Sequence, residues 1–327
     1  MATYILIATL KVVVVFSVFM LIVAYLSYVE RRLVARFQTR IGPNRVGPAG
    51  LLQPVADAIK LITKEEIFPD NANKLLFLLA PILSLVPALL IMSVVPFGDS
   101  VTLFGHNIDL IISDIDVGVL FVFAVTSLGV YGVVMAGWSS NSKYSLLGAL
   151  RSSAQMISYE VSYGLSIVGV LMLAGTLNLM EIVENQSSLL DWYIFKQPIG
   201  FIIFLICGIA ENNRAPFDLP EAESELVAGY FTEYSSMKFG MFFMAEYAQM
   251  VNVSAIVTTL FLGGWQGPLL PPVVWFLIKV FAFIFLYIWI RATLPRFRYD
   301  QLMSFGWKFL LPLALLNIFV TGIFMYL

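Results

Sequence analysis

Charged residues are scarce in this sequence. Asp, Glu, Lys and Arg make up only 12% of its 327 residues, whereas 60% are hydrophobic. A soluble domain is closer to a quarter charged, and apolar runs of the length of a membrane span recur along the whole chain. The scarcity excludes a large soluble domain and predicts an all-α, polytopic membrane protein. We expect a single integral membrane domain over residues 1–327.

Ligands for metals and clusters are equally scarce. The chain holds one cysteine, Cys207, and one histidine, His106, which is too few for a disulfide framework, a zinc site or an iron–sulfur cluster. It has neither a Gly-x-Gly-x-x-Gly motif after a strand pattern nor a Walker loop. Its net charge of −2 gives nucleic-acid binding no electrostatic support. Any redox cofactor is therefore expected in another chain.

The apolar runs predict about eight membrane spans. They lie roughly at residues 3–28, 75–97, 116–137, 154–178, 197–212, 239–262, 273–293 and 308–326. The first run has the full length of a span and no cleavage site, so we interpret it as a retained helix and not as a signal peptide.

Positive charge is distributed unevenly over the connections. One set of connections holds 16 of the 19 basic residues. The three basic residues outside it are Lys11, Lys196 and Lys279. Lys and Arg concentrate in cytoplasmic loops, so this set is expected on the cytoplasmic side, or on the matrix side in a mitochondrion. Both termini are then expected on the opposite side, in the periplasm or the intermembrane space.

The basic side has a cytoplasmic loop over residues 30–74 that contains the sequence RIGPNRVGPAG. Its Gly and Pro content excludes a helix interior. The following LLQPVADAIKLI places Leu52, Val55 and Ile59 on one face, which is typical of a short amphipathic helix at a membrane interface. A rigid turn beside such a helix can frame an opening for a lipid-like molecule. The alternative is a positively charged loop with an interfacial helix and no ligand.

A second cytoplasmic loop, residues 213–238, gathers five carboxylates at one place. They are Asp218, Glu221, Glu223, Glu225 and Glu233. Asp218 stands three residues before Glu221, as in a capping box, so a helix is expected to start there. Like charges this close favour proton uptake when they are partly buried, and the apolar residues among them favour burial. The alternative is a solvated acidic loop.

Four carboxylates lie within a predicted span or at its end. They are Glu30, Glu160, Glu211 and Glu246. A charge at mid-bilayer costs roughly 2.5–3.5 kcal/mol on insertion scales, so such residues usually face the bundle interior and mark ion or proton paths. Neighbouring tyrosines favour a polar interior around Glu160 and Glu246. The alternative, most plausible for Glu211, is a position near an interface where the side chain reaches water.

Four stretches carry a resemblance to a known family. They are ERRLVARFQTRIGPNRVGPAGLLQPVADAIKL, GWSSNSKYSLLGALRSSAQMISYE, ENNRAPFDLPEAESELVAGYFTEYSSMKF and IRATLPRFRYDQLMSFGWK. In these stretches, in their order and in their spacing, the chain resembles the quinone-chamber membrane subunit of respiratory complex I. That enzyme is the proton-pumping NADH:quinone oxidoreductase, in which this component is the bacterial H subunit or the mitochondrial subunit 1. The resemblance implies a fold of eight transmembrane helices.

The resemblance also implies roles for particular residues. Those expected to line or position a quinone tunnel are Arg31, Arg32, Arg40, Arg45, Asp57 and Lys60. Those expected in an acidic loop beneath the tunnel are Asp218, Glu221, Glu223, Glu225 and Glu233, with Arg214 as their local partner. Those expected in a buried proton path towards antiporter-like subunits are Glu30, Glu160, Glu211 and Glu246.

By the same resemblance, quinone is the substrate, and FMN and the iron–sulfur clusters belong to partner subunits. The expected partners are hydrophilic subunits that carry the terminal cluster and complete the quinone site. Small membrane subunits, antiporter-like membrane subunits and lipids are expected as well, but no nucleic acid. The expected location is the bacterial inner membrane, with the mitochondrial inner membrane as the alternative.

Three other functions are alternatives. The homologous membrane subunit of a hydrogenase-type complex need not bind quinone, and the full RIGPNRVGP loop and the complete acidic string favour the quinone enzyme over it. A cation/proton antiporter is expected to show internal repeats with broken helices, and no repeat is visible in the sequence. A scaffold without chemistry of its own is the third alternative.

Overall fold

The structure, a computed structural model, describes residues 2–103, 106–218 and 227–326, and most of these are helical. The long helices are α1 (Ala2–Phe37), α3 (Lys74–Ile91), α4 (Gly118–Ser139), α5 (Lys143–Ala174), α8 (Pro198–Glu211), α10 (Ser236–Phe261), α11 (Pro272–Thr293) and α13 (Leu311–Tyr326). The short helices are α2 (Gln53–Thr63), α6 (Leu179–Glu184), α7 (Tyr193–Lys196) and α12 (Tyr299–Phe305). Single turns lie at Pro48–Gly50, Leu189–Asp191 and Gly229–Phe231, and a π-helical turn at Gly306–Leu310 joins α12 to α13.

Six helices in the described part of the chain are long and apolar enough to cross a membrane. They are α1, α3, α4, α5, α11 and the helical segment Tyr299–Tyr326. Helix α8 is apolar but short, with 14 residues, and α10 carries Lys238, Glu246 and several polar residues within its length. Helices thus occupy all eight predicted spans. The prediction of a mostly helical, multi-pass membrane protein is confirmed, whereas eight crossings stay a prediction.

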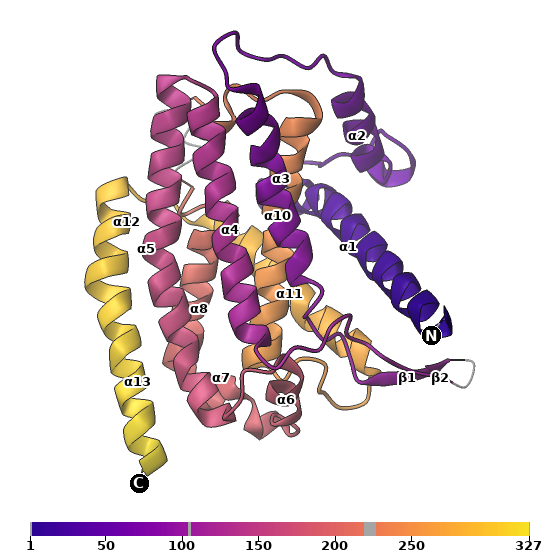
Figure 1. Ribbon diagram of the computed structural model, residues 1–327, viewed down its shortest axis with the longest axis vertical. Coiled ribbons are helices and arrows are strands. Elements are labelled where there is room, and N and C mark those ends of the chain that lie inside the picture. Colours follow the sequence, from indigo (N-terminus) through magenta and orange to yellow (C-terminus); the bar gives the residue numbers. More distant parts are fainter. Residues whose placement is uncertain (1, 104–105, 219–226, 327) are drawn as a thin grey trace.

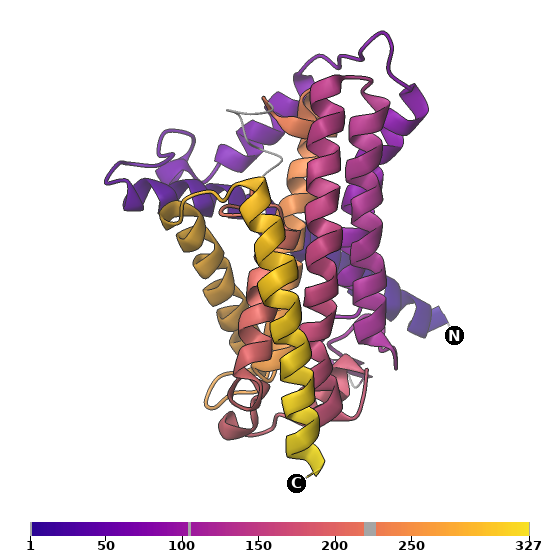
Figure 2. The same cartoon turned by 90° about the vertical axis from the view of Figure 1, so that its left-hand side faces the viewer.

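The long helices form a bundle whose two ends differ. In Figure 1, α3, α4, α5 and α10 run side by side, while α1 leans away from them towards its N-terminal end. Helix α2 and the long basic connection lie at the upper end of the bundle, and Figure 2 shows them projecting from it. Both termini lie in the lower half of the view. This arrangement agrees with termini on one side of the membrane, and which side they face stays a prediction.

Helix α1 extends beyond its predicted span, from residue 28 to Phe37. The predicted loop over 30–74 therefore begins as helix, and Glu30 and Arg31 belong to α1. The reason is that no Gly or Pro interrupts the chain before Gly42, and a helix tolerates charged residues where its end leaves the membrane. The helix stops before Thr39, whose φ of 54° lies in the left-handed region.

A β-hairpin that the sequence analysis does not predict follows α3. Strand β1 (Ser100–Leu103) pairs antiparallel with β2 (His106–Asp109), with Ser100 opposite Asp109. Lys11 of α1 donates a hydrogen bond to Ile111 O at 2.7 Å. This contact connects the segment after the hairpin to the outlying helix α1.

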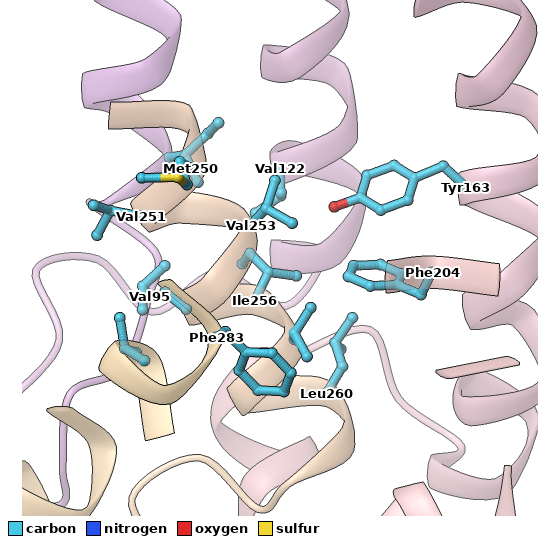
Figure 3. Packing of buried hydrophobic residues seen from close by; sticks show 14 of the residues in the cluster. Val95, Val122, Tyr163, Phe204, Met250, Val251, Val253, Ile256, Leu260 and Phe283 are labelled. Atoms are coloured by element: carbon cyan, nitrogen blue, oxygen red, sulfur yellow. The ribbon is translucent and has the colours of Figure 1, made fainter. Parts of the chain in front are cut away.

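The main apolar core surrounds α10, which contacts α1, α3, α8 and α11. Figure 3 shows Val253, Ile256 and Leu260 of α10 facing Tyr163 of α5 and Phe204 of α8. Tyr163 and Phe204 lie with ring centroids 4.3 Å apart. Since lipid is as apolar as these side chains, close packing stabilises such an interface more than transfer out of water does.

Lys279 of α11 fixes the end of α10 that lies opposite the basic side. Its ammonium donates hydrogen bonds to the carbonyl oxygens of Leu262 at 2.7 Å, Gly264 at 2.9 Å and Gln266 at 2.6 Å. It also lies 4.3 Å from the centroid of the Trp192 ring, a distance typical of a cation–π contact. All three N–H groups are used, so this buried charge ties the connection between α10 and α11 to both helices.

We expect Lys279→Met to destabilise the protein strongly. The methionine fills the same space but leaves three buried carbonyls unpaired, at a cost of about 1–3 kcal/mol for each. Thermal unfolding of the purified complex measures this, with Lys196→Met as the matched control because Lys196 is exposed and pairs with Asp191 at the surface. Equal unfolding temperatures for the two variants would show that the carbonyl contacts contribute little.

Candidate functional site

A cavity of about 740 Å³, the large cavity, lies between α1, α2, α10 and α11. Five of the residues predicted for the site line it, namely Glu30, Arg31, Arg40, Asp57 and Lys60. Its apolar lining consists of Val23, Ala24, Val34, Pro54, Ala58, Leu61, Met237, Phe239, Gly240, Phe243, Met244 and Ala292. A largely apolar pocket of this size with a few polar groups is typical of a small-molecule site.

Helix α2, the predicted amphipathic helix, forms one wall of the large cavity. Pro54 stands in its first turn, where a missing N–H is tolerated. The Tyr28 hydroxyl of α1 donates a hydrogen bond to Ala49 O at 2.6 Å, just before α2 begins. Near its other end, the Ser236 hydroxyl of α10 donates to Leu61 O at 2.9 Å. These contacts attach α2 to the two helices that face it across the cavity.

Asp57 collects the polar contacts at the edge of the large cavity. Arg31 Nη1 lies 2.7 Å from Asp57 Oδ2, and Lys60 Nζ lies 3.7 Å from Asp57 Oδ1. Gln53 donates a further hydrogen bond to Asp57 Oδ1 at 3.2 Å. The side chains of Arg31 and Lys60 are 50% and 69% exposed, and exposed pairs contribute only about 0–1 kcal/mol. The edge can therefore rearrange at little cost when a ligand enters.

Two of the predicted tunnel residues do not line the large cavity. Arg32 donates a hydrogen bond to the Tyr28 hydroxyl at 2.7 Å and lies over the same ring at 5.4 Å. Arg45 is exposed on the connection before α2. Arg32 thus supports the contact between α1 and the start of α2, and a direct role of either residue in a tunnel stays a prediction.

A group of charges around the buried Arg214, the Arg214 cluster, adjoins the large cavity. It consists of Glu30, Arg214, Glu246, Tyr247 and Arg291. Arg214 Nη1 lies 2.7 Å from Glu30 Oε1, and Arg214 Nε lies 2.5 Å from Glu246 Oε1. Arg291 contacts the same Glu30 oxygen, and the Arg214 guanidinium lies 4.5 Å from the centroid of the Tyr247 ring. One arginine therefore connects carboxylates from α1 and α10.

Arg214 carries a permanent charge in this position. Burial lowers the pKa of its guanidinium, but the Glu246 and Glu30 carboxylates outweigh burial and hold that pKa above its ordinary value. A buried charge of this kind requires such partners, because an unpaired one is strongly destabilising. The arrangement holds two acids on either side of a cation that does not titrate.

The Arg214 cluster separates the large cavity from a second one. Glu30, Tyr247 and Arg291 line the large cavity. Glu246 lines a cavity of about 80 Å³, the small cavity, together with Glu211 at the end of α8. The two predicted acids Glu30 and Glu246 thus lie on opposite sides of Arg214, each facing a different cavity.

Glu160 lies beyond the small cavity. Its carboxylate accepts a hydrogen bond from the Ser127 hydroxyl of α4, and it is close enough to Glu211 to repel it electrostatically. Glu211 is buried, which contradicts the alternative of a side chain that reaches water at an interface. The four acids therefore lie in the spatial order Glu30, Glu246, Glu211 and Glu160 from the large cavity into the bundle, an order that the sequence analysis does not predict.

The acidic loop is described only in part. Asp218 is buried, and its Oδ2 lies 2.9 Å from Arg296 Nη2. Burial raises the pKa of the Asp218 carboxyl, and the Arg296 guanidinium opposes that rise. Glu233 is partly buried before α10. Glu221, Glu223 and Glu225 lie outside the described residues, as does the helix expected to start at Asp218, so their roles stay predictions.

Among the described residues, Arg214 and Asp218 of this loop pair with residues of other segments. The carboxylates recorded with Arg214 are Glu30 and Glu246, which come from α1 and α10. Arg291 and Arg296 count in the sequence only as positive charges on one side of the membrane. Their stretch IRATLPRFRYD does belong to the resemblance, which was the signal available for them. Within residues 2–103, 106–218 and 227–326, no group of His, Cys, Asp and Glu could hold a metal ion.

The sequence is similar to known proteins over nearly its whole length. A family model described as NADH dehydrogenase matches residues 10–322. The chain is 58% identical over 326 residues to the NADH-quinone oxidoreductase H subunit 2 of Geobacter metallireducens, covering 96% of this chain and 94% of that protein. It is 56% identical over 349 residues to the NADH-quinone oxidoreductase H subunit 2 of Koribacter versatilis, covering 100% and 99%. It is 55% identical over 318 residues to the NADH-quinone oxidoreductase H subunit of Thermomicrobium roseum, covering 95% and 93%. The chain therefore belongs to the NADH dehydrogenase family, among the membrane components known as the H subunits of NADH-quinone oxidoreductase.

Proposed function

We propose that this chain forms the membrane wall of the quinone chamber in a proton-pumping NADH-quinone oxidoreductase and couples quinone reduction to proton movement. The observation that carries the proposal is the shared wall. The large cavity, which fits an amphiphilic ligand, ends on the Arg214 cluster, and the same cluster borders the small cavity with Glu211. A change of charge on one side therefore acts directly on acids on the other.

The large cavity suits a molecule with an apolar tail and a polar head. Met237, Phe243 and Met244 supply an apolar surface along α10, and thioether and aromatic side chains adapt well to flat rings and flexible tails. Arg31 and Lys60 lie at the edge, where they can hydrogen-bond an oxygen of the head. This lining favours quinone over a small inorganic substrate.

The Arg214 cluster supplies the coupling step. The electrons that reduce a quinone make it negatively charged until two protons complete the neutral quinol, and this transient charge acts beside Glu30 and Arg291. Arg214 then shifts its hydrogen bonding between Glu30 and Glu246. A buried carboxylate that loses a cationic partner takes up a proton more readily, so Glu246 becomes the first acceptor on the far side. Glu211 and Glu160 extend the path.

The same proposal assigns the partners. With one cysteine and one histidine, the chain has too few ligands for an iron–sulfur cluster, so electrons arrive from such a cluster in a hydrophilic subunit, with FMN and further clusters in others. Hydrophilic subunits complete the quinone site, and small and antiporter-like membrane subunits continue the proton path. The similar proteins described above come from bacteria, which favours the bacterial inner membrane.

The hydrogenase-type alternative is less well supported. It requires no ligand in the membrane subunit, whereas the large cavity brings together four residues predicted for a quinone tunnel, Arg31, Arg40, Asp57 and Lys60. An antiporter alternative has no support from internal repeats. A scaffold without chemistry gives no reason for a buried arginine between two acids.

Filling the large cavity tests the quinone site. Ala58 of α2 lines the cavity, so Ala58→Trp is expected to raise the Michaelis constant for quinone about tenfold, which corresponds to about 1.4 kcal/mol. Ile59→Trp is the matched control, because Ile59 lies on the same helix, is 56% exposed and does not line the cavity. Steady-state quinone reduction by the assembled complex measures both. Equal constants for the two variants would contradict a quinone site here.

A further inference from the structure

Asn212 is a buried polar residue to which the proposed function gives no role. It follows Glu211 directly at the end of α8, and its backbone N–H donates to Gly208 O at 3.3 Å. Its side chain lines the small cavity and is almost fully buried. Neither its amide nitrogen nor its amide oxygen has a hydrogen-bond partner among the described residues. The same is true of Glu211 Oε2.

Unpaired polar atoms in such numbers require an explanation. Buried amides in proteins are hydrogen-bonded in the great majority of cases, either to protein groups or to ordered water. An unpaired buried donor or acceptor is costly. Here three atoms belong to two consecutive residues that line the same cavity, and its other lining residues with polar side-chain atoms are Ser84, Thr126, Asn213, Tyr230, Glu246 and Gln249.

The small cavity has the size and the lining for water. A single water molecule needs roughly 10–15 Å³ of accessible space and two to four polar partners, and the small cavity offers about 80 Å³. Several molecules fit. Its two acids, Glu211 and Glu246, both face this space, so a bound water can contact either of them.

From this geometry we infer that Asn212 holds a cluster of ordered water molecules in the small cavity and thereby positions a hydrogen-bonded connection between Glu246 and Glu211. The inference rests on the proposed function, because the water cluster would form the middle segment of the proposed proton path. The amide suits the task, since it donates and accepts at once and does not titrate. It can therefore orient water without competing with the acids for the proton.

Asn212→Leu tests the inference, because leucine has nearly the same shape and neither polar atom. The backbone at this position has φ −78° and ψ 2°, which leucine adopts without strain. We expect proton pumping by the assembled complex in vesicles to fall roughly tenfold, less than the about 10²–10⁴-fold effect of a lost general acid or base, because Asn212 positions water and does not itself carry the proton. Asn212→Gln keeps the amide and is expected to restore most of the pumping.

Thr259→Val is the matched control. Thr259 is buried in α10 away from the small cavity, and its hydroxyl bonds within its own helix to Ala255 O at 2.8 Å. This change also removes one buried polar group without altering shape, so pumping is expected to stay at the native level. If proton pumping is lost in the Asn212→Leu variant but not in the Thr259→Val variant, the effect comes from the small cavity and not from a general loss of stability.

Two outcomes would overturn the inference. If assembled Asn212→Leu pumps normally while Glu211→Gln does not, the acids act without Asn212, and the proposed function survives. If the Asn212→Leu and Glu211→Gln variants both pump normally, the proposed coupling path is contradicted as well. If the Asn212→Leu variant fails to assemble, the inference is tested instead by a density map of the native complex that resolves ordered water. Water density beside Asn212 supports the inference, and a dry small cavity contradicts it.

Discussion

Replacing Arg214 by methionine is expected to abolish quinone-linked proton pumping and to destabilise the complex. The change leaves the buried Glu30 and the partly buried Glu246 without their shared cation, although Arg291 still contacts Glu30. Removing one partner of a buried ion pair typically costs about 3–5 kcal/mol. Thermal unfolding of the purified complex and pumping in vesicles measure the two effects.

The matched control for Arg214→Met is Arg298→Met. Arg298 has a 78% exposed side chain and pairs with Asp300 at 3.4 Å, so its loss is expected to cost less than about 1 kcal/mol. Arg214→Lys keeps the charge but has no planar fork of donors that can contact two carboxylates at fixed angles. We expect the Arg214→Lys variant to recover part of the lost stability but almost none of the lost proton pumping. Native pumping in Arg214→Met would contradict the role assigned to the cluster.

Glu211→Gln is the second change with a large expected effect. Glutamine keeps the size and the hydrogen-bonding capacity of the side chain but cannot carry a proton between states. Loss of a positioned acid or base lowers rates by about 10²–10⁴, so we expect pumping to fall by at least the lower of these factors. Quinone binding is expected to stay native, because Glu211 does not line the large cavity.

Proton translocation and the Michaelis constant for quinone, measured on the same preparation, separate these two effects. Glu181→Gln serves as the control, since Glu181 is an exposed acid in α6, far along the chain from the path. A Glu211→Gln complex that pumps like the control would exclude Glu211 from the path. A raised Michaelis constant would show that the change reaches the large cavity.

The helices of this protein follow from composition and apolar runs alone. The ends of the helices do not follow from these features, because a helix can continue where its side chains leave the membrane. Helix α1 is an example. In the sequence Glu30 and Arg31 are predicted at the start of a loop, yet they belong to α1, whose Tyr28 contacts Ala49 in the connection before α2. The hairpin of β1 and β2 was not predicted at all, since each strand has only four residues.

The members of the candidate site could be predicted, but their pairing could not. Glu30, Arg214 and Glu246 each stand out in the sequence as a buried or loop charge. Their contacts join residues 184 and 32 positions apart, and no local pattern encodes such distances. The resemblance predicts that Glu30 and Glu246 share a path and places Arg214 with the acidic loop; it does not predict that Arg214 stands between these two acids. Asn212 belongs to the stretch ENNRAPFDLPEAE of the resemblance, but nothing in the sequence distinguishes it there, because only its missing hydrogen-bond partners mark it.

The central claim is that a change of charge in the large cavity alters the protonation of acids beyond Arg214. Infrared difference spectroscopy of the intact complex, recorded as quinone is reduced to quinol, measures carboxyl protonation directly. We predict a carboxyl signal in the native complex that is lost or clearly reduced in Glu211→Gln and in Arg214→Met. An identical difference spectrum in the native complex and in both variants would contradict the claim.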